Sequence, residues 1–194
     1  MKAANQLDGP LLVFTDGQFM PESSRIDADG LYVDVNHVSA SDAPSVVMLK
    51  VQASTVQLSV VHVATGKAPL GDLSIELHVA AGVSLELREY WEGDVAEATS
   101  HTQHWVSFVE EGATLRWLSQ HQLSKDFQLR TTGVHNVKGG MDYHVTTLGQ
   151  GCVDATLLVK LQAEQATCRV HGLLLGQGKG QSTQQWRIEH LATN

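Results

Sequence analysis

Two nine-residue segments of the chain share one pattern. VAAGVSLEL (79–87) and VEEGATLRW (109–117) both read V-x-x-G-small-[ST]-L-x-apolar, with glycines at Gly82 and Gly112. A third segment, LGQGCVDATLLV, matches the pattern only in part and contains Gly151. In a chain of strands, a period of about 30 residues predicts a solenoid in which each copy forms one coil. The glycine permits a positive φ at the corner, and the apolar residues after it point into the coil.

Alternation of apolar and polar residues indicates strands along most of the chain. In LSIELHV (73–79) one face is apolar, and it is formed by Leu73, Ile75, Leu77 and Val79. Similar runs recur about every 8–12 residues, and no window has the period of a helix. Strands alone fit a sandwich, a barrel or a solenoid. With the repeat, the sequence predicts an all-β fold, a right-handed parallel β-helix (β-solenoid) with an irregular N-terminal strand leading into it.

Two stretches depart from this regularity. SASDAP (39–44) is the most loop-like segment and predicts an irregular join. The sequence stops at EHLATN (189–194), directly after a strand-like run and with no capping helix. The last coil of a solenoid leaves N–H and C=O groups unpaired, and these must be covered. We therefore expect either a partner at this end or a longer protein.

Composition narrows the classes of function. Hydrophobic residues make up 42% of the 194 residues and charged residues 18%, which excludes a disordered acidic chain. The net charge is −8, with no cluster of Lys or Arg, which argues against binding to nucleic acid or a membrane surface. The longest N-terminal apolar run extends only from Leu11 to Phe14, which is shorter than a signal peptide or a transmembrane helix needs. The sequence predicts a soluble, cytoplasmic protein.

The two cysteines, Cys152 and Cys168, lie well apart in the sequence and form no CxxC motif. They are too few for a disulfide scaffold or a cysteine zinc site, so we expect free thiols. No G-x-S-x-G motif indicates a serine nucleophile, and neither cysteine has a recognisable reactive context. The acidic residues are scattered along the chain, so no carboxylate pair is predicted.

The glycine-rich segment GLLLGQGKGQSTQQWRIEH (172–190) does not match a nucleotide-binding motif. A Walker A loop needs four residues between its glycines and Ser or Thr after the lysine, whereas here there are five and Gly180 follows Lys179. The dinucleotide fingerprint G-x-G-x-x-G fails because Gln181 occupies the sixth position from Gly176. We expect a wide turn between two strands.

The chain contains ten histidines. His101 and His104 lie on one predicted strand, where this spacing directs them to opposite faces, so they are not expected to share a metal. Six others fall in alternating runs and are able to stack into ladders that bind a metal: His62, His78, His121, His135, His144 and His171. The favoured interpretation is polar positions on a solvated face. The four tryptophans, Trp91, Trp105, Trp117 and Trp186, are expected to pack the core or its rim.

The order of several phrases resembles the core domain of the SufB/SufD family, the β-helical scaffold proteins of Suf iron–sulphur cluster assembly, and is closer to SufD. The phrases are GPLLVFTDGQFMPESS (9–24), LSIELHVAAGVSLELREYW (73–91), TQHWVSFVEEGATLRWLSQHQLSKDF (102–127), TTGVHNVKGGMDYHVTTLGQGC (131–152) and CRVHGLLLGQGKGQSTQQWRIEHLATN (168–194). In the last phrase, Gly172 matches a glycine that follows a strand, Gln181 and Gln184 a polar turn, and His190 the closing histidine. Gly172 and His190 are expected to be structural.

The resemblance implies a scaffold that is not an enzyme and that pairs with SufB-like and SufC-like Suf proteins. Residues 1–194 would form a single SufD-like β-helix core domain. This domain would be incomplete relative to full-length family members, which are about twice as long and add helical segments and further coils. Association with an iron–sulphur cluster is implied by the family alone. The family's cluster-assembly residues lie in those further coils, so no catalytic, cofactor or metal residue transfers to this chain.

Three other interpretations are considered: a homodimer, a carbohydrate-active enzyme and a metal-binding barrel. Without the family's later coils, the open end of the solenoid favours a homodimer. A carbohydrate-active β-helix enzyme, of the polysaccharide lyase or hydrolase type, would need acidic and basic residues gathered on one sheet, and no such cluster is visible in the sequence. A cupin-like metal barrel needs H-x-H, whereas His101 and His104 give H-x-x-H.

Overall fold

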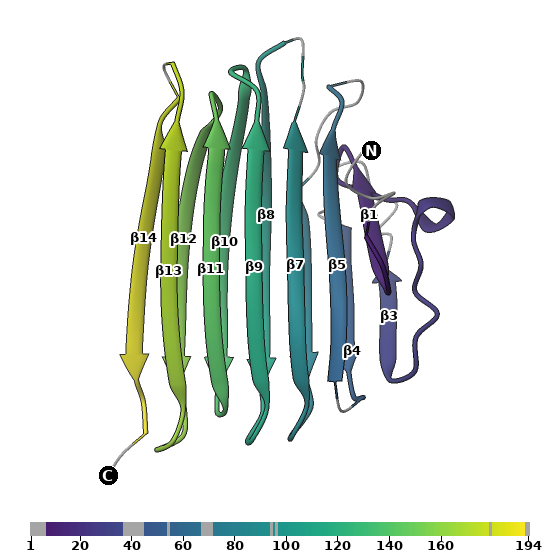
Figure 1. Cartoon of the computed structure of the whole chain (residues 1–194), viewed down its shortest axis with the longest axis vertical. Helices are drawn as coiled ribbons and strands as arrows, with labels where there is room; N and C mark the ends of the chain where they lie inside the picture. Colours follow the sequence, from purple (N-terminus) through teal and green to yellow (C-terminus); the bar gives the residue numbers. More distant parts are fainter. Residues whose placement is uncertain are drawn as a thin grey trace.

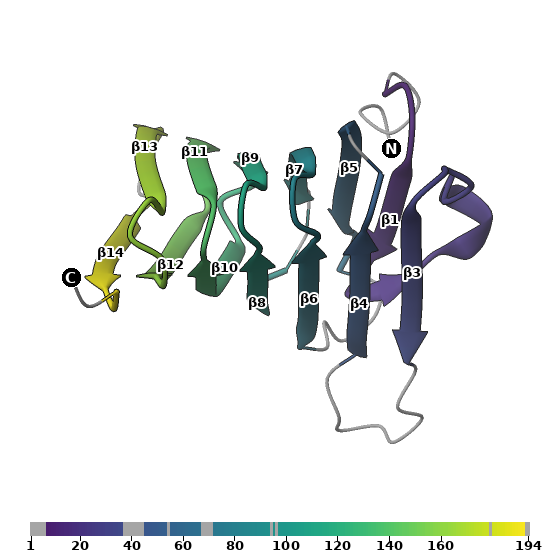
Figure 2. The same cartoon turned by 90° about the horizontal axis from the view of Figure 1, so that it is seen from below.

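The structure, a computed structural model, describes residues 7–36, 45–53, 55–66, 72–93, 95, 97–178 and 180–192. Two seven-stranded sheets face each other across a common interior (Figure 2). Sheet A contains, in spatial order, β13 (Thr167–Gly176), β11 (Gly140–Gly149), β9 (Thr114–Leu123), β7 (Ser84–Gly93), β5 (Thr55–Ala64), β1 (Leu11–Thr15) and β2 (Gln18–Phe19). Sheet B contains β14 (Ser182–His190), β12 (Cys152–Leu161), β10 (Phe127–Val137), β8 (Thr99–Val109), β6 (Leu73–Val79), β4 (Ser45–Val51) and β3 (Leu31–Asn36).

From β4 onward the chain alternates between the sheets, so each coil contributes one strand to each sheet. All neighbours from β4 to β14 pair in parallel, and β5 is also parallel to β1. Figure 1 shows the chain rising through sheet A, crossing at the upper turns and descending through sheet B as it advances toward the C-terminus. This path is right-handed. The predicted right-handed parallel β-helix is confirmed.

The sequence repeat marks two stacked corners of the solenoid. Ser84 pairs with Thr114, the equivalent position of the second copy, and the N–H of Gly82 donates to the carbonyl of Glu111 at 3.1 Å. Gly82 and Gly112 have φ values of +71° and +67°, in the left-handed region that glycine adopts without strain. The predicted role of these two glycines is confirmed.

Gly151 is not a third copy of this corner. It lies between β11 and β12, at the opposite turns, where a Cβ would stand 2.6 Å from the Cβ of Leu123. The next coil is also shorter, because the step from Thr114 to its partner Gly140 is smaller than the step from Ser84 to Thr114. Gly151 follows Gly112 by about one and a half coils rather than one, so the third segment was wrongly aligned with the first two copies.

The N-terminal end of the solenoid is closed by antiparallel strands. The short β2 pairs with β1, and β3 pairs with β4, which gives the irregular lead-in that the sequence predicts. A 3-10 helix (Pro21–Ser23) follows β2. Leu11, Val13 and Val61 form a small buried cluster beneath Leu7 and Met20, outside the main core. The predicted join at 39–44 lies outside the described residues.

Strand alternation divides the side chains between the interior and the two outer faces. β6 shows it without exception, because Leu73, Ile75, Leu77 and Val79 are buried and the residues between them are half-buried. The first coils have an apolar interior of Val, Leu and Ile. The interior of the middle coils also contains polar side chains. No helix that could span a membrane occurs in the part of the chain that the structure describes.

Candidate functional site

The histidines separate into an inner group and an outer group. The inner group is almost fully buried between the sheets and consists of His62, His101, His121 and His135. The outer group lies on the outer faces of the strands and includes His78, His104, His144 and His171. His101 and His104 therefore point to opposite faces of β8, as predicted. Assignment of His62, His121 and His135 to a solvated face was wrong, because their positions in the alternation face the interior.

Glu89 lies at the centre of the inner group, on β7, with a relative exposure of 2%. One carboxylate oxygen accepts hydrogen bonds from Gln103 Nε2 at 2.9 Å and Trp105 Nε1 at 3.1 Å. The other accepts from Trp117 Nε1 at 3.3 Å and Ser119 Oγ at 3.0 Å. These donors come from β8 and β9, so they join both sheets through one carboxylate.

His62 completes the surroundings of this carboxylate. Its Nε2 lies 3.2 Å from Glu89 Oε1, and its ring stacks between Trp91 at 4.2 Å and Phe14 at 5.2 Å. Burial by itself raises the pKa of Glu89, but His62 and the other donors outweigh it, and the pKa falls from 4.5 to about 2. Glu89 is therefore ionised at neutral pH.

The other inner histidines are neutral at that pH. Burial lowers the pKa of His101 to about 3, of His121 to about 4 and of His135 to about 3. His121 lies between Ser119 Oγ at 3.0 Å and Thr147 Oγ1 at 3.1 Å, and His135 lies 2.7 Å from Ser107 Oγ. Neither ring nitrogen of His101 is hydrogen-bonded to a described residue.

The inner cluster is closed to substrates. The cavity beside Glu89, which is also lined by Gly133 and Trp186, has a volume of about 20 Å³. That space holds about one water molecule. The arrangement is that of a polar core centred on the Glu89 carboxylate, in which some buried atoms, including both ring nitrogens of His101, have no hydrogen-bond partner among the described residues.

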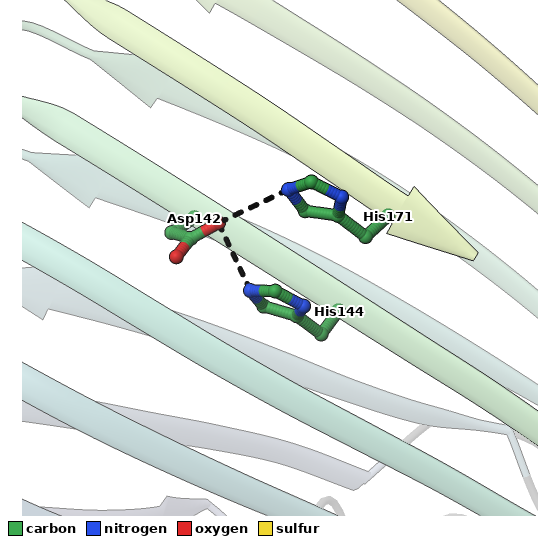
Figure 3. A group of neighbouring side chains, drawn as sticks. All are labelled: Asp142, His144 and His171. Atoms are coloured by element: carbon green, nitrogen blue, oxygen red, sulfur yellow. Dashed lines mark ion pairs between the residues drawn. The ribbon is translucent and has the colours of Figure 1, made fainter. Parts of the chain in front are cut away.

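Asp142, His144 and His171 form a second cluster on the outer face of sheet A. Asp142 and His144 lie two residues apart on β11, and His171 is the register partner of His144 on β13. The two imidazole rings stack with centroids 4.6 Å apart and planes at 13°. Figure 3 shows one nitrogen of each ring directed at the Asp142 carboxylate, with Nε2–Oδ1 distances of 3.0 Å for His144 and 3.9 Å for His171.

The sequence indicated His144 and His171 only as members of possible histidine ladders, and it gave no role to Asp142. A signal was present: DYH at 142–144 places a carboxylate and a histidine on one strand face, and His171 follows His144 at close to the length of one coil. The sequence alone does not show that His171 lies beside His144, because the coils are not of equal length and the register between β11 and β13 is needed.

Charged residues also gather on the outer face of sheet A. Glu86, Arg116, Asp142 and Arg169 occupy one row across β7, β9, β11 and β13. Glu86 pairs with Arg88 at 2.6 Å and with Arg116 at 3.4 Å. The sequence showed no such mixed cluster, because its members are about one coil apart along the chain.

The C-terminal end of the solenoid is open among the described residues. β13 and β14 have a neighbouring strand on one side only (Figures 1 and 2). Side chains that would face the interior stand at this end with large exposed fractions: Leu174 at 44%, Trp186 at 42% and Ile188 at 43%. Apolar surface and free strand edges thus occupy the same end of the molecule.

The residues singled out in the last phrase of the family resemblance lie at this open end. Gly172 was predicted to follow a strand but lies within β13, where a Cβ would be 2.7 Å from Trp186 Cη2. It leaves room for the indole of Trp186. Gln184 likewise lies in β14 rather than in a turn, and His190 is the exposed last residue of that strand. The predicted wide turn is confirmed between β13 and β14, with Gly178 at φ +67°.

Cysteines and tryptophans take largely structural positions. Cys152 and Cys168 are free, as predicted, and both are half-buried. Burial raises the pKa of the Cys168 thiol to about 11, and the nearby Asp142 adds to the shift, so this thiol is a poor nucleophile. Trp91, Trp105 and Trp117 are buried in the core, whereas Trp186 forms the rim of the open end.

Comparisons with known proteins identify no family for this chain. No protein-family model matches it, and no curated protein matches it. The resemblance to the SufB/SufD family therefore stays a prediction, and the β-solenoid fold is what the chain is shown to have.

Proposed function

We propose that this protein is a scaffold and interaction component of a cytoplasmic Suf-type iron–sulphur cluster assembly system, similar to SufD. The Suf-type role is supported by the sequence resemblance, and the interaction role by one structural observation: among the described residues, the free edges of β13 and β14 flank the exposed Leu174, Trp186 and Ile188. Edge strands and apolar patches of this kind are sites of protein association.

The occupant we propose for the open end is the β-solenoid of a SufB-like partner. A partner strand beside β13 and another beside β14 would pair the free backbone groups of both edges. The partner's own interior would then cover Trp186 and Ile188, which continue the rows of Leu157 and Val159. A continuous core across the junction would stabilise the complex through both hydrogen bonds and apolar burial. A SufC-like ATPase is the further partner that the resemblance implies.

The test is co-purification of the chain with SufB-like and SufC-like proteins, followed by light scattering to obtain the stoichiometry. We expect a stable complex with the SufB-like protein. Ile188→Lys should abolish it, because a charge would enter the buried junction. Gln185→Lys is the matched control, since Gln185 lies on the outer face of the same strand, and it should leave the complex intact.

Two results would contradict the proposal. A chain that stays monomeric with the SufB-like protein at high concentration has no such partner. A homodimer that Ile188→Lys disrupts would keep the open end as an interface, but would replace the SufB-like partner with a second copy of the chain.

The second candidate function is a carbohydrate-active enzyme acting on acidic polysaccharides. The row of Glu86, Arg116, Asp142 and Arg169 on the outer face of sheet A favours it, because arginines bind carboxylated sugars and carboxylates supply acid–base groups. Depolymerisation of an acidic polysaccharide that is lost in Arg116→Gln would support this candidate. An inactive chain that forms the complex with the SufB-like protein would exclude it.

A further inference from the structure

We propose that Asp142, His144 and His171 bind one divalent transition-metal ion of the Zn²⁺ type on the outer face of sheet A. The inference does not depend on the scaffold function. It rests on the arrangement of three donor atoms whose positions are fixed by two adjacent parallel strands.

The backbone brings the three side chains to one place. Asp142 and His144 are two residues apart, so strand alternation puts both on the same face of β11. The register of β11 and β13 places His171 directly beside His144. The three potential ligand atoms lie within 4.8 Å of one another. Sites built on strands hold their ligands more firmly than sites built on loops.

Two of the donor atoms are without a hydrogen bond. Asp142 Oδ1 and His144 Nε2 are inaccessible to solvent, and neither makes a hydrogen bond of acceptable geometry to a described residue, although they lie 3.0 Å apart. The two atoms lie at ion-pair distance, so a positive charge between them would interact favourably with both. A cation bound by both atoms and by His171 would satisfy each of them at once.

The donor set selects the class of metal. Two imidazoles and one carboxylate suit Zn²⁺, Co²⁺ or Ni²⁺, whereas Mg²⁺ and Ca²⁺ prefer oxygen ligands alone. Ligand distances of about 2.0–2.2 Å place two tetrahedral donors roughly 3.3 Å apart. The Asp142–His144 distance of 3.0 Å is near this value, and the His171 distance of 3.9 Å requires a small rotation of its ring. A fourth position remains for water or another ligand.

Neighbouring charges limit the affinity. Arg116 and Arg169 are the register partners of Asp142 on either side, and their positive charges oppose a cation. Arg116 reaches Glu86 at 3.4 Å, which offsets part of its charge. The site is therefore expected to bind Zn²⁺ reversibly.

The molecule contains a natural comparison for this site. On sheet B, Glu76 contacts His78, two residues away on β6, with the same spacing as Asp142 and His144. The register partner of His78 on the next strand is Phe108, whose ring stacks on it at 4.7 Å and 21°. This pair has two of the three donors and an aromatic ring where the third would be.

The experiment is a titration of the untagged, chelator-treated chain with Zn²⁺ by calorimetry, with Co²⁺ absorption as a report of tetrahedral coordination. We expect one equivalent of metal. H144A, H171A and D142N should each weaken binding by roughly tenfold or more, since even outer-shell changes cost about 10–100-fold. H78Q is the matched control and should leave binding unchanged. All variants should keep the circular dichroism of the unchanged chain, because the substituted positions are outside the core.

A gain of binding gives the stricter test. F108H places an imidazole beside His78, so in the H171A background it should restore one equivalent of metal on sheet B. Binding that persists unchanged in H144A and H171A would overturn the proposal. Failure of F108H to restore binding would also count against it, because the same arrangement of donors on neighbouring strands would then be insufficient.

Discussion

The inner and outer faces of the same strands use histidine in opposite ways. His121 on β9 points inward, lies between two hydroxyl groups and has its pKa lowered to about 4 by burial. His144 on the adjacent β11 points outward and directs a nitrogen toward Asp142 and His171. Sheet A therefore has buried, hydrogen-bonded histidines on its inner face and histidines directed at potential metal ligands on its outer face.

The difference follows from what surrounds each ring. An interior imidazole loses its water and stays neutral, so it serves as a hydrogen-bond partner within a fixed network. An outer imidazole such as that of His144 keeps part of its ring exposed and lies beside a carboxylate and a second imidazole, which are potential metal ligands. Four predictions, ordered by the size of the expected effect, test this separation.

Acid should unfold the protein through its inner histidines. The folded-state pKa values of His101, His121 and His135 are about 3 to 4, below the ordinary value of 6.5, so the unfolded chain binds more protons. The three neutral rings contribute fully to the stability of the folded state above pH 6.5. This contribution is lost as the pH falls from 6.5 toward the folded-state pKa values of about 3 to 4. Each histidine that binds a proton only in the unfolded chain lowers the free energy of unfolding by about 1.4 kcal/mol per pH unit. The three together lower it by about 4 kcal/mol per pH unit. Urea denaturation at several pH values measures it. A flat profile across this range would show that these rings are not sealed from water.

Glu89→Gln should cost about 3–5 kcal/mol in the free energy of unfolding. The amide places N–H donors against Trp117 and Ser119, which already donate, and leaves His62 without the carboxylate beside it. The control is Glu86→Gln on the outer face of the same strand, where the cost should stay below about 1 kcal/mol. Thermal or chemical denaturation of both variants gives the comparison. Equal losses of unfolding free energy in the two variants would contradict the distinction between the inner and outer faces of β7.

His101→Leu should stabilise the protein by about 1 kcal/mol, because it removes two buried ring nitrogens that have no hydrogen-bond partner among the described residues. The row of His101 continues with Leu129 and Val153, so an apolar side chain suits the position. His104→Leu, on the outer face of the same strand, should change stability by less than about 0.5 kcal/mol. Both changes are measured by urea denaturation. A destabilised His101→Leu variant would indicate that the ring has a partner inside the solenoid.

Arg169→Gln should raise the Zn²⁺ affinity of the outer cluster by about threefold, the size of an exposed charge–charge interaction. Arg169 is the register partner of Asp142 and is exposed, so its removal should leave the fold unchanged. Arg130→Gln, on sheet B near Asp154, provides the control and should not alter binding. Calorimetry of both variants measures the effect, and a weaker Arg169→Gln site would imply that the arginine orients a ligand.

Much of the fold was predictable because the alternation of inward and outward residues along a strand is visible in a short stretch of sequence. Alternation in LSIELHV correctly assigned the inward residues of β6, and the pair Gly82 and Gly112 gave the length of one coil. The later coils are shorter, as the paired positions Thr114 and Gly140 show, and this change of length hid the repeat in the C-terminal half.

The candidate site was less predictable for the same reason. Alternation states that His121 and Gln122 face opposite ways, but it does not say which of them faces the interior when both are polar. Here the interior accepts histidines because Glu89 and the surrounding hydroxyl groups provide partners, which is a property of several coils together. The outer cluster likewise depends on register between β11 and β13, and no local pattern contains that information.

The regular offset between paired strands has a consequence for synthesis. From β6 onward, each strand pairs with one that lies about one coil earlier in the chain, and the closed end of the solenoid is the N-terminal one. A chain leaving the ribosome presents that closed end first, and every later coil finds its template already in place. We expect amide exchange to be slowest in the first coils and fastest in β13 and β14. The free edges of β13 and β14 are then the places at which the strands of a further coil would pair.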